Sequence, residues 1–141
     1  MLVKCKILII DAAESTRSFM RFILNNAGYR VTTVNSGVKA YREIEEDNFD
    51  VIVIDLRLPD VDGIELVREV RKISTFETIP ILAVTQFFNT ETQEEGAAAG
   101  ITHWITQPVS PKKLLAIVDE ISPAAETFDD EIVAQLIKDN S

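Results

Sequence analysis

The segment that most restricts the fold of this chain is a strand-like run ending in an aspartate. Val51 to Ile54 are four consecutive β-branched residues, and such a run is typical of a strand buried on both faces in the middle of a parallel sheet. Asp55 follows at the carboxyl end of this strand, where open α/β sheets carry their functional groups. We therefore predict that Asp55 is presented at the edge of a parallel sheet. From this segment alone, an aspartate that only ends a strand and caps a turn explains the pattern equally well.

The residues after Asp55 predict a loop and then a helix. Pro59 and Gly63 are turn-forming residues, and Asp62 is suited to cap a helix over 64–73.

The same alternation of short apolar runs and amphipathic segments continues along the chain. Further strands are predicted over 4–10, 29–34, 81–85 and 101–106. Further helices are predicted over 15–26, 37–46, 90–99 and 111–121. Five strand–helix pairs with short connections favour an α/β fold, in which helices cover both faces of a five-stranded parallel sheet.

The spacing of apolar residues predicts which helix faces are buried. In helix 15–26 the buried stripe is predicted to consist of Phe19, Phe22, Ile23 and Ala27. In helix 37–46 a thin apolar face is predicted, formed by Val38, Tyr41, Ile44 and Glu45. Helix 90–99, which Thr90 is predicted to cap, has almost no large apolar side chain, so we expect it to be the least firmly packed.

The last twenty residues differ from the rest. Residues 122–126 contain a proline and small residues, and the apolar residues after them share one helical face: Phe128, Ile132, Val133, Leu136 and Ile137. The chain is therefore divided into a domain over 1–121 and a linker with an amphipathic sixth helix over 122–141. This helix could dock on the domain, form a homodimer, or lead into an output domain.

Length and charge limit the function. A chain of 141 residues forms one domain, and its formal net charge of −9 argues against direct binding to nucleic acid. Cys5 is the only cysteine and is expected to be a small buried residue of the first strand. No export signal or membrane span is apparent, and a cytoplasmic location is expected.

Three polar residues come directly after or at the end of predicted strands: Asp11, Asp55 and Thr85. This combination resembles the receiver domain of bacterial two-component response regulators over residues 4–121. The most specific match is Asp55 to Gly63, because the family carries its phosphoacceptor aspartate four residues before a proline and eight before a glycine. Further matches are Ile9-Ile10-Asp11, Thr85, Ala99-Gly100, Trp104 and Gln107-Pro108. The resemblance implies the strand order 2-1-3-4-5.

The resemblance also implies a signalling role, not an enzyme with its own substrate. A sensor histidine kinase would transfer a phosphoryl group from a phosphohistidine to Asp55, and Mg²⁺ would neutralise the charge. The implied ligands of Mg²⁺ are Asp11, Asp55 and the backbone carbonyl of Arg57. Thr85 and Trp104 would form the conformational switch.

Two residues depart from the family pattern at this site. Ala12 stands where a second acid is usual, and Gln107 stands at the position of the lysine before the proline. Without the acid, Mg²⁺ binding should weaken, and without the lysine the transfer should slow. Arg57 could supply the missing charge, although a solvated loop arginine paired with a neighbouring acid is the simpler interpretation. Glu14 could reach the metal, although a favourable charge at a helix start is simpler.

Two other functions fit parts of the sequence. A pseudo-receiver would keep the fold but act through phosphorylation-independent protein contacts. A flavodoxin-like flavin carrier would use Ser15 and Thr16 to hold a phosphate at a helix start, but the loop lacks glycine. A phosphatase of the aspartate-nucleophile type would need a second aspartate two residues after the first, which this sequence lacks after both Asp11 and Asp55.

His103 is expected to be a surface residue, and Gln86 could crowd the entrance to the site.

Overall fold

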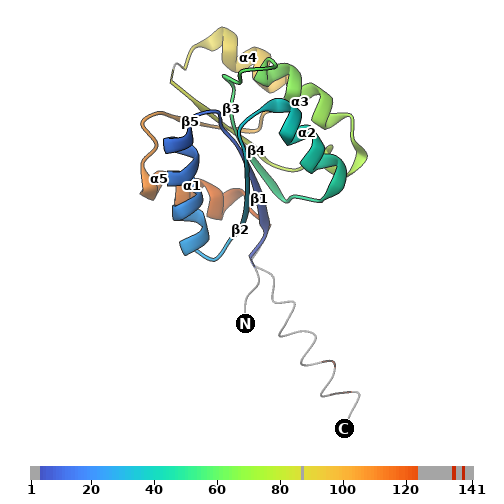
Figure 1. Cartoon of the computed structure of the whole chain (residues 1–141), viewed down its shortest axis with the longest axis vertical. Helices are drawn as coiled ribbons and strands as arrows, with labels where there is room; N and C mark the ends of the chain where they lie inside the picture. The colour runs from blue at the N-terminus through green and yellow to red at the C-terminus, as the bar shows by residue number, and fades with distance from the viewer. Residues whose placement is uncertain (1–3, 87, 124–134, 136–137, 139–141) are drawn as a thin grey trace.

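A parallel sheet of five strands forms the centre of the molecule (Figure 1). The computed structural model describes residues 4–86 and 88–123, together with 135 and 138. The strands are Lys6–Ile10 (β1), Arg30–Val34 (β2), Val51–Asp55 (β3), Ile81–Thr85 (β4) and His103–Thr106 (β5). Their order is β2-β1-β3-β4-β5, and all four pairings are parallel. The predicted fold class and strand order are confirmed.

Helices cover both faces of this sheet. They are Glu14–Asn26 (α1), Gly37–Glu46 (α2), Gly63–Arg71 (α3), Thr90–Ala99 (α4) and Pro111–Ile121 (α5), with a short 3₁₀ turn over Ser74–Phe76 (η1). Figure 1 shows α1 and α5 on one face and α2, α3 and α4 on the other. The predicted sixth helix lies in the last part of the chain, where only residues 135 and 138 are described. Among the described residues, no helix is long and apolar enough to cross a membrane.

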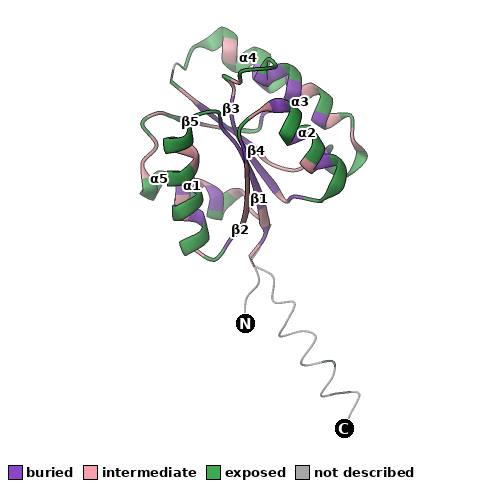
Figure 2. Ribbon diagram, viewed as in Figure 1, coloured by how far each residue is buried: buried purple, intermediate pink, exposed green. Residues whose placement is uncertain are grey.

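The sheet separates two apolar clusters, because successive side chains of a strand point to opposite faces. Leu8 and Ile10 belong to the cluster under α2, α3 and α4. Ile7 and Ile9 belong to the cluster under α1 and α5. The buried residues follow the sheet and the inner helix faces, whereas the outer helix faces are exposed (Figure 2).

The buried face of α1 agrees with the prediction in part. Ile23 and Ala27 of the predicted stripe pack against the cluster under α1 and α5, whereas Phe19 is 41% exposed and Phe22 is 67% exposed. Met20 and Leu24, which were not predicted, are fully buried. Periodicity alone allows more than one apolar stripe on this helix and does not define which one is buried.

The buried face of α2 also agrees with the prediction in part. Ile44 is buried as predicted, whereas Val38 is 49% and Tyr41 36% exposed, and Glu45 is exposed. The buried Ala40 was not predicted as a core residue.

The α4 helix has the predicted bounds but a different N-cap. Asn89, not Thr90, is the N-cap, and its side-chain oxygen accepts a hydrogen bond of 2.8 Å from the N–H of Thr92. The only buried residues of α4 are Gly96 and Ala99, in accord with the expected weak packing. The segment before β4 contains η1, whose Phe76 is 1% exposed.

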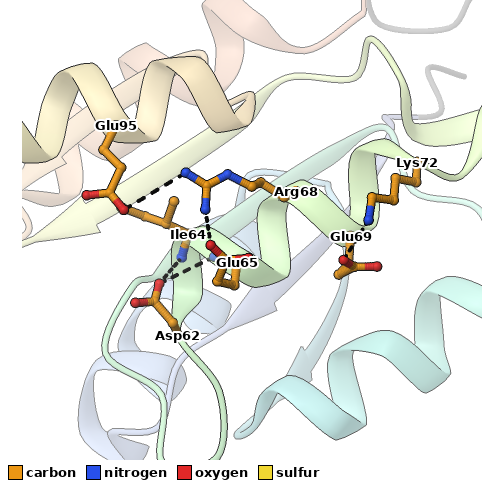
Figure 3. A network of polar contacts seen from close by, with 7 residues as sticks. All are labelled: Asp62, Ile64, Glu65, Arg68, Glu69, Lys72 and Glu95. Carbon is orange, nitrogen blue, oxygen red and sulfur yellow. Dashed lines mark hydrogen bonds and ion pairs between the residues drawn. The ribbon is translucent and has the colours of Figure 1, made fainter.

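Charged side chains connect α4 to α3 on the outer surface (Figure 3). Asp62 caps α3, as predicted, by accepting hydrogen bonds from the N–H groups of Ile64 (2.8 Å) and Glu65 (3.3 Å). Arg68 forms ion pairs with Glu65 of its own helix and, at 4.0 Å, with Glu95 of α4. Because these pairs are exposed, they contribute little to stability.

Candidate functional site

The carboxyl ends of three neighbouring strands place the predicted site residues together. β1, β3 and β4 are adjacent, with Ile10 beside Ile54 and Asp55 beside Val84. Asp11 therefore follows β1 next to the end of β3, and Thr85 ends β4 on the other side.

Asp55 is held by its own loop and by the loop after β5. It is 8% exposed, and its Oδ1 accepts a hydrogen bond of 2.9 Å from the N–H of Arg57. Its Oδ2 lies 3.4 Å from the Nε2 of Gln107, a long hydrogen bond. Gln107 thus lies at the Asp55 carboxylate and offers it a neutral donor.

Asp11 is the most buried charged residue of the site. It is 1% exposed, and its Oδ1 accepts a hydrogen bond of 2.8 Å from the N–H of Ala13. Its Oδ2 is buried without a hydrogen-bond partner. Burial raises the pKa of the Asp11 carboxyl above its usual value. The hydrogen bond from Ala13 lowers this pKa by a smaller amount, and the negative charge of Asp55 raises it further.

These two carboxylates suit a small divalent cation. Mg²⁺ is usually bound by one or two carboxylates together with waters and phosphoryl oxygens, and the unpartnered Oδ2 of Asp11 is a ligand atom that such an ion would satisfy. No group of three or more His, Cys, Asp or Glu residues in the described part of the chain could hold a metal. A third protein ligand would therefore be a backbone oxygen, for which the carbonyl of Arg57 is the candidate.

The loop that follows Asp55 and carries Arg57 is held in place by two aspartates. Asp60 accepts hydrogen bonds of 2.9 Å from the N–H groups of Gly37 and Val38, which begin α2. Asp62 caps α3, and its backbone forms a bridge with that of Arg57. Since both carboxylates bind backbone groups, neither forms the ion pair with Arg57 that was the simpler interpretation.

Arg57 and Glu14 are both exposed. The sequence suggested them as substitutes for the lysine and the acid that are absent at Gln107 and Ala12. The side chain of Arg57 makes no hydrogen bond or ion pair with another described residue and extends toward solvent. Glu14 lies in the first turn of α1, the position of a favourable helix-terminal charge.

Arg17 of α1 is the site residue that the sequence reasoning missed. Its Nη1 donates a hydrogen bond of 2.8 Å to the backbone carbonyl of Asp11 and lies 3.4 Å from that of Ala12. Ala12 itself is exposed. The signal was present in the sequence, since an arginine in the second turn of a helix can reach back to the loop before it.

The predicted switch residues lie along the α4 side of the sheet. Thr85 is partly buried, and its backbone carbonyl accepts a hydrogen bond of 2.8 Å from the N–H of Gln107. Trp104 packs edge to face on Phe88, with the ring centroids 5.8 Å apart. A Cβ atom on Gly96 would lie 2.6 Å from the indole of Trp104, so the glycine makes room for that ring against α4.

An open pocket on the α1 side includes Gln107, the residue that contacts Asp55. It is lined by Ser15, Thr16, Phe19, Gln86, Gln107, Pro108 and Val109. His103 is exposed, as expected, and its Nδ1 lies 2.8 Å from the hydroxyl of Thr102.

The chain is similar to proteins of known sequence. Residues 7–119 match the response regulator receiver domain family. The chain is 31% identical over 139 residues to the alkaline phosphatase synthesis transcriptional regulatory protein PhoP of Bacillus subtilis, covering 94% of this chain and 57% of PhoP. It is 30% identical over 119 residues to a 14.6 kDa protein of Leptolyngbya boryana, covering 84% of this chain and 91% of that protein. The chain thus spans little more than half of PhoP.

Solved structures agree with the sequence relatives. The chemotaxis protein CheY4 of Vibrio cholerae is 34% identical and superposes with a TM-score of 0.81, covering 84% of this chain and 98% of CheY4. The receiver domain of the sensor histidine kinase PA1611 of Pseudomonas aeruginosa is 29% identical, with a TM-score of 0.77, covering 84% of this chain and 97% of that domain. That structure has a magnesium ion coordinated in its active-site cleft. With its sheet order, its strand-end carboxylates and this match over residues 7–119, the chain belongs to the response regulator receiver domain family.

Proposed function

We propose that this domain accepts a phosphoryl group on Asp55 from a sensor histidine kinase and thereby changes its interactions with a protein partner or output domain. The observation that carries the proposal is the buried pair of Asp11 and Asp55, in which Oδ2 of Asp11 has no partner. A buried anion without a partner is costly, and a site that binds a divalent cation and a phosphoryl group gives that atom a role.

In the proposed transfer, a carboxylate oxygen of Asp55 attacks the phosphorus of the phosphohistidine in line. The new P–O bond forms as the P–N bond breaks, and the electron pair of that bond remains on the imidazole nitrogen. Bound Mg²⁺ would supply the charge neutralisation that this transfer requires. Its proposed ligands are the carboxylates of Asp11 and Asp55 and the backbone carbonyl of Arg57.

The chain's own residues orient this reaction. The N–H of Arg57 fixes the Oδ1 of Asp55, and the fixed loop limits rotation of the carboxylate. The amide of Gln107, 3.4 Å from the Oδ2, can donate to a phosphoryl oxygen but brings no charge. We therefore expect slower transfer than in a site with a lysine there.

The proposed response to phosphorylation uses Thr85 and Trp104. The hydroxyl of Thr85, at the end of the neighbouring strand, would donate a hydrogen bond to the phosphoryl group. The loop from β4 to α4 would then move inward, and Trp104 would change its packing beside Gly96. The output would follow from this change on the α4 side, through a separate partner, a homodimer or a continuing chain after the 1–121 domain.

A pseudo-receiver is the second candidate, and Ala12 together with Gln107 favours it. Both residues remove charged groups that support the transfer, so the fold could signal through protein contacts alone.

Intact-mass measurement after incubation with acetyl phosphate and Mg²⁺ distinguishes the two. A gain of one phosphoryl group that disappears in Asp55→Asn supports phosphotransfer. No gain under these conditions, with the protein folded, supports the pseudo-receiver. A gain that persists in Asp55→Asn would show a different acceptor and refute the assignment of Asp55.

A further inference from the structure

Arg17 connects α1 to the loop that carries Asp11. Its guanidinium donates to the carbonyl of Asp11 at 2.8 Å and lies near that of Ala12 at 3.4 Å. Arg17 is half-buried, so the position of its charge is fixed more firmly than that of the exposed Arg57.

The charge of Arg17 acts on the acidic pair. The guanidinium of Arg17 binds the backbone carbonyl of Asp11 itself, so its positive charge lies near the carboxylate of this residue. The two carboxylates and this guanidinium carry a formal charge of about −1 together. Because position 12 is an alanine, no further negative charge there attracts a cation.

We propose that Arg17 is a positioning residue that holds the β1–α1 loop in place and supplies a fixed positive charge to the Asp11–Asp55 pair, thereby lowering the affinity of the site for divalent cations. The inference rests on the proposed function, because it concerns the same metal site. Its consequence is that part of the charge of the carboxylate pair is neutralised by the protein itself, without a metal.

The expected size of the effect follows from Coulomb's law. For any unit positive charge and divalent cation separated by about 8 Å in a medium with the dielectric constant of water, Coulomb's law gives about fivefold weaker binding, and a lower dielectric constant makes the effect larger. Salt screens this repulsion, so the effect should decrease between low and physiological ionic strength.

Cation binding can be measured without phosphorylation. Free Mn²⁺ is counted by electron paramagnetic resonance in the presence of the whole chain, and Mg²⁺ affinity is obtained by competition. The variants are Arg17→Gln, which removes the charge, and Arg17→Lys, which retains the charge but loses the fork of the guanidinium. Arg21→Gln is the matched control, because Arg21 is an exposed residue one turn further along α1. Urea unfolding shows that each variant is folded.

The inference predicts that Arg17→Gln binds Mn²⁺ and Mg²⁺ about fivefold more tightly at low salt, that Arg17→Lys stays close to the parent protein, and that Arg21→Gln does not differ from it. If the arginine only held the loop, both Arg17 variants would bind more weakly and the difference would not depend on salt. That result, or equal affinity in all proteins, overturns the inference about Arg17, whereas the proposed metal site would still be supported by the binding itself. If neither the parent nor Arg17→Gln binds a cation, the proposed metal site itself is wrong, and the inference fails with it.

Discussion

Replacing Asp11 by asparagine is expected to stabilise the protein when no metal is present. The Oδ1 of Asp11 accepts from the N–H of Ala13 at 2.8 Å, and asparagine can keep this bond. The unpartnered Oδ2 becomes a neutral amide NH₂ group, which does not repel the charge of Asp55. The substitution removes a buried unpaired charge and its repulsion by a second carboxylate.

The magnitude follows from the cost of a buried polar atom without a partner, which is about 1–3 kcal/mol. Because asparagine must also be accommodated, we expect the free energy of unfolding at pH 7 to rise by about 1–2 kcal/mol, and Tm by roughly 3–6 °C for a domain of this size. Urea unfolding followed by circular dichroism, in buffer with a chelator, measures this difference.

The effect should depend on pH in a defined direction. The pKa of Asp11 is raised in the folded protein above the ordinary value of 3.8, chiefly by burial. The folded state therefore holds a proton that the unfolded state releases, so the stability of the parent protein falls as the pH rises from 3.8 through the raised pKa. The advantage of Asp11→Asn should be small below pH 3.8 and complete above the raised pKa.

Mg²⁺ provides the matched comparison. Mg²⁺ binding should raise the free energy of unfolding of the parent protein, and at Mg²⁺ concentrations well above Kd this increase grows with the logarithm of the concentration. The same additions should stabilise Asp11→Asn much less. Lower stability of Asp11→Asn at pH 7 without metal, or a difference that does not change with pH, would refute the account of Asp11 as an uncompensated buried carboxylate.

Three other substitutions test neighbouring features. Gln107→Lys places a charge beside Asp55, so the rate of phosphorylation by acetyl phosphate, followed by intact mass, should rise about a hundredfold; an unchanged rate would contradict the role given to this position. Gly96→Ala gains about 1 kcal/mol of helix propensity but loses about 1–3 kcal/mol by overpacking against Trp104, so urea unfolding should show a net loss, and a gain would mean that the indole moves freely. Asp60→Asn removes one of two hydrogen bonds to the start of α2, and these bonds lower the pKa of Asp60. The stability that the Asp60 carboxylate contributes is therefore present above pH 3.8 and is lost as the pH falls through the lowered pKa. Thermal unfolding should show a lower Tm for the variant at pH 7 and a smaller difference near pH 3.

Local sequence signals predicted much of the architecture. The β-branched run before Asp55 became a fully buried strand, because such residues pack well on both faces of a central strand. Asp62 caps α3 and Ser110 caps α5, with its Oγ 3.3 Å from the N–H of Lys113. Gly100, with φ of +122°, ends α4 directly after the predicted helix 90–99. In each case the signal and its effect lie within a few residues of one another.

Contacts between distant segments were not predictable in this way. Asp60 caps a helix that begins 23 residues earlier, and nothing in the neighbourhood of Asp60 indicates this partner. The exposure of Phe19 and Phe22 depends on the rotation of α1 against α5, which periodicity does not define. The role of Arg17 depends on the course of the loop after β1, and the prediction considered only Arg57 and Glu14 as substitutes.

The separation of the two apolar clusters by the sheet has a consequence for sequence divergence. Leu24 lies in the cluster under α1 and α5, and Phe76 in the cluster on the opposite face. Substitutions of side chains that share no neighbours change the free energy of unfolding additively. Substitutions in the layer of α1 and α5 can therefore accumulate independently of those in the layer of α2, α3 and α4. Only the carboxyl edge of the sheet, to which loops from both layers contribute, obliges the two halves to evolve together.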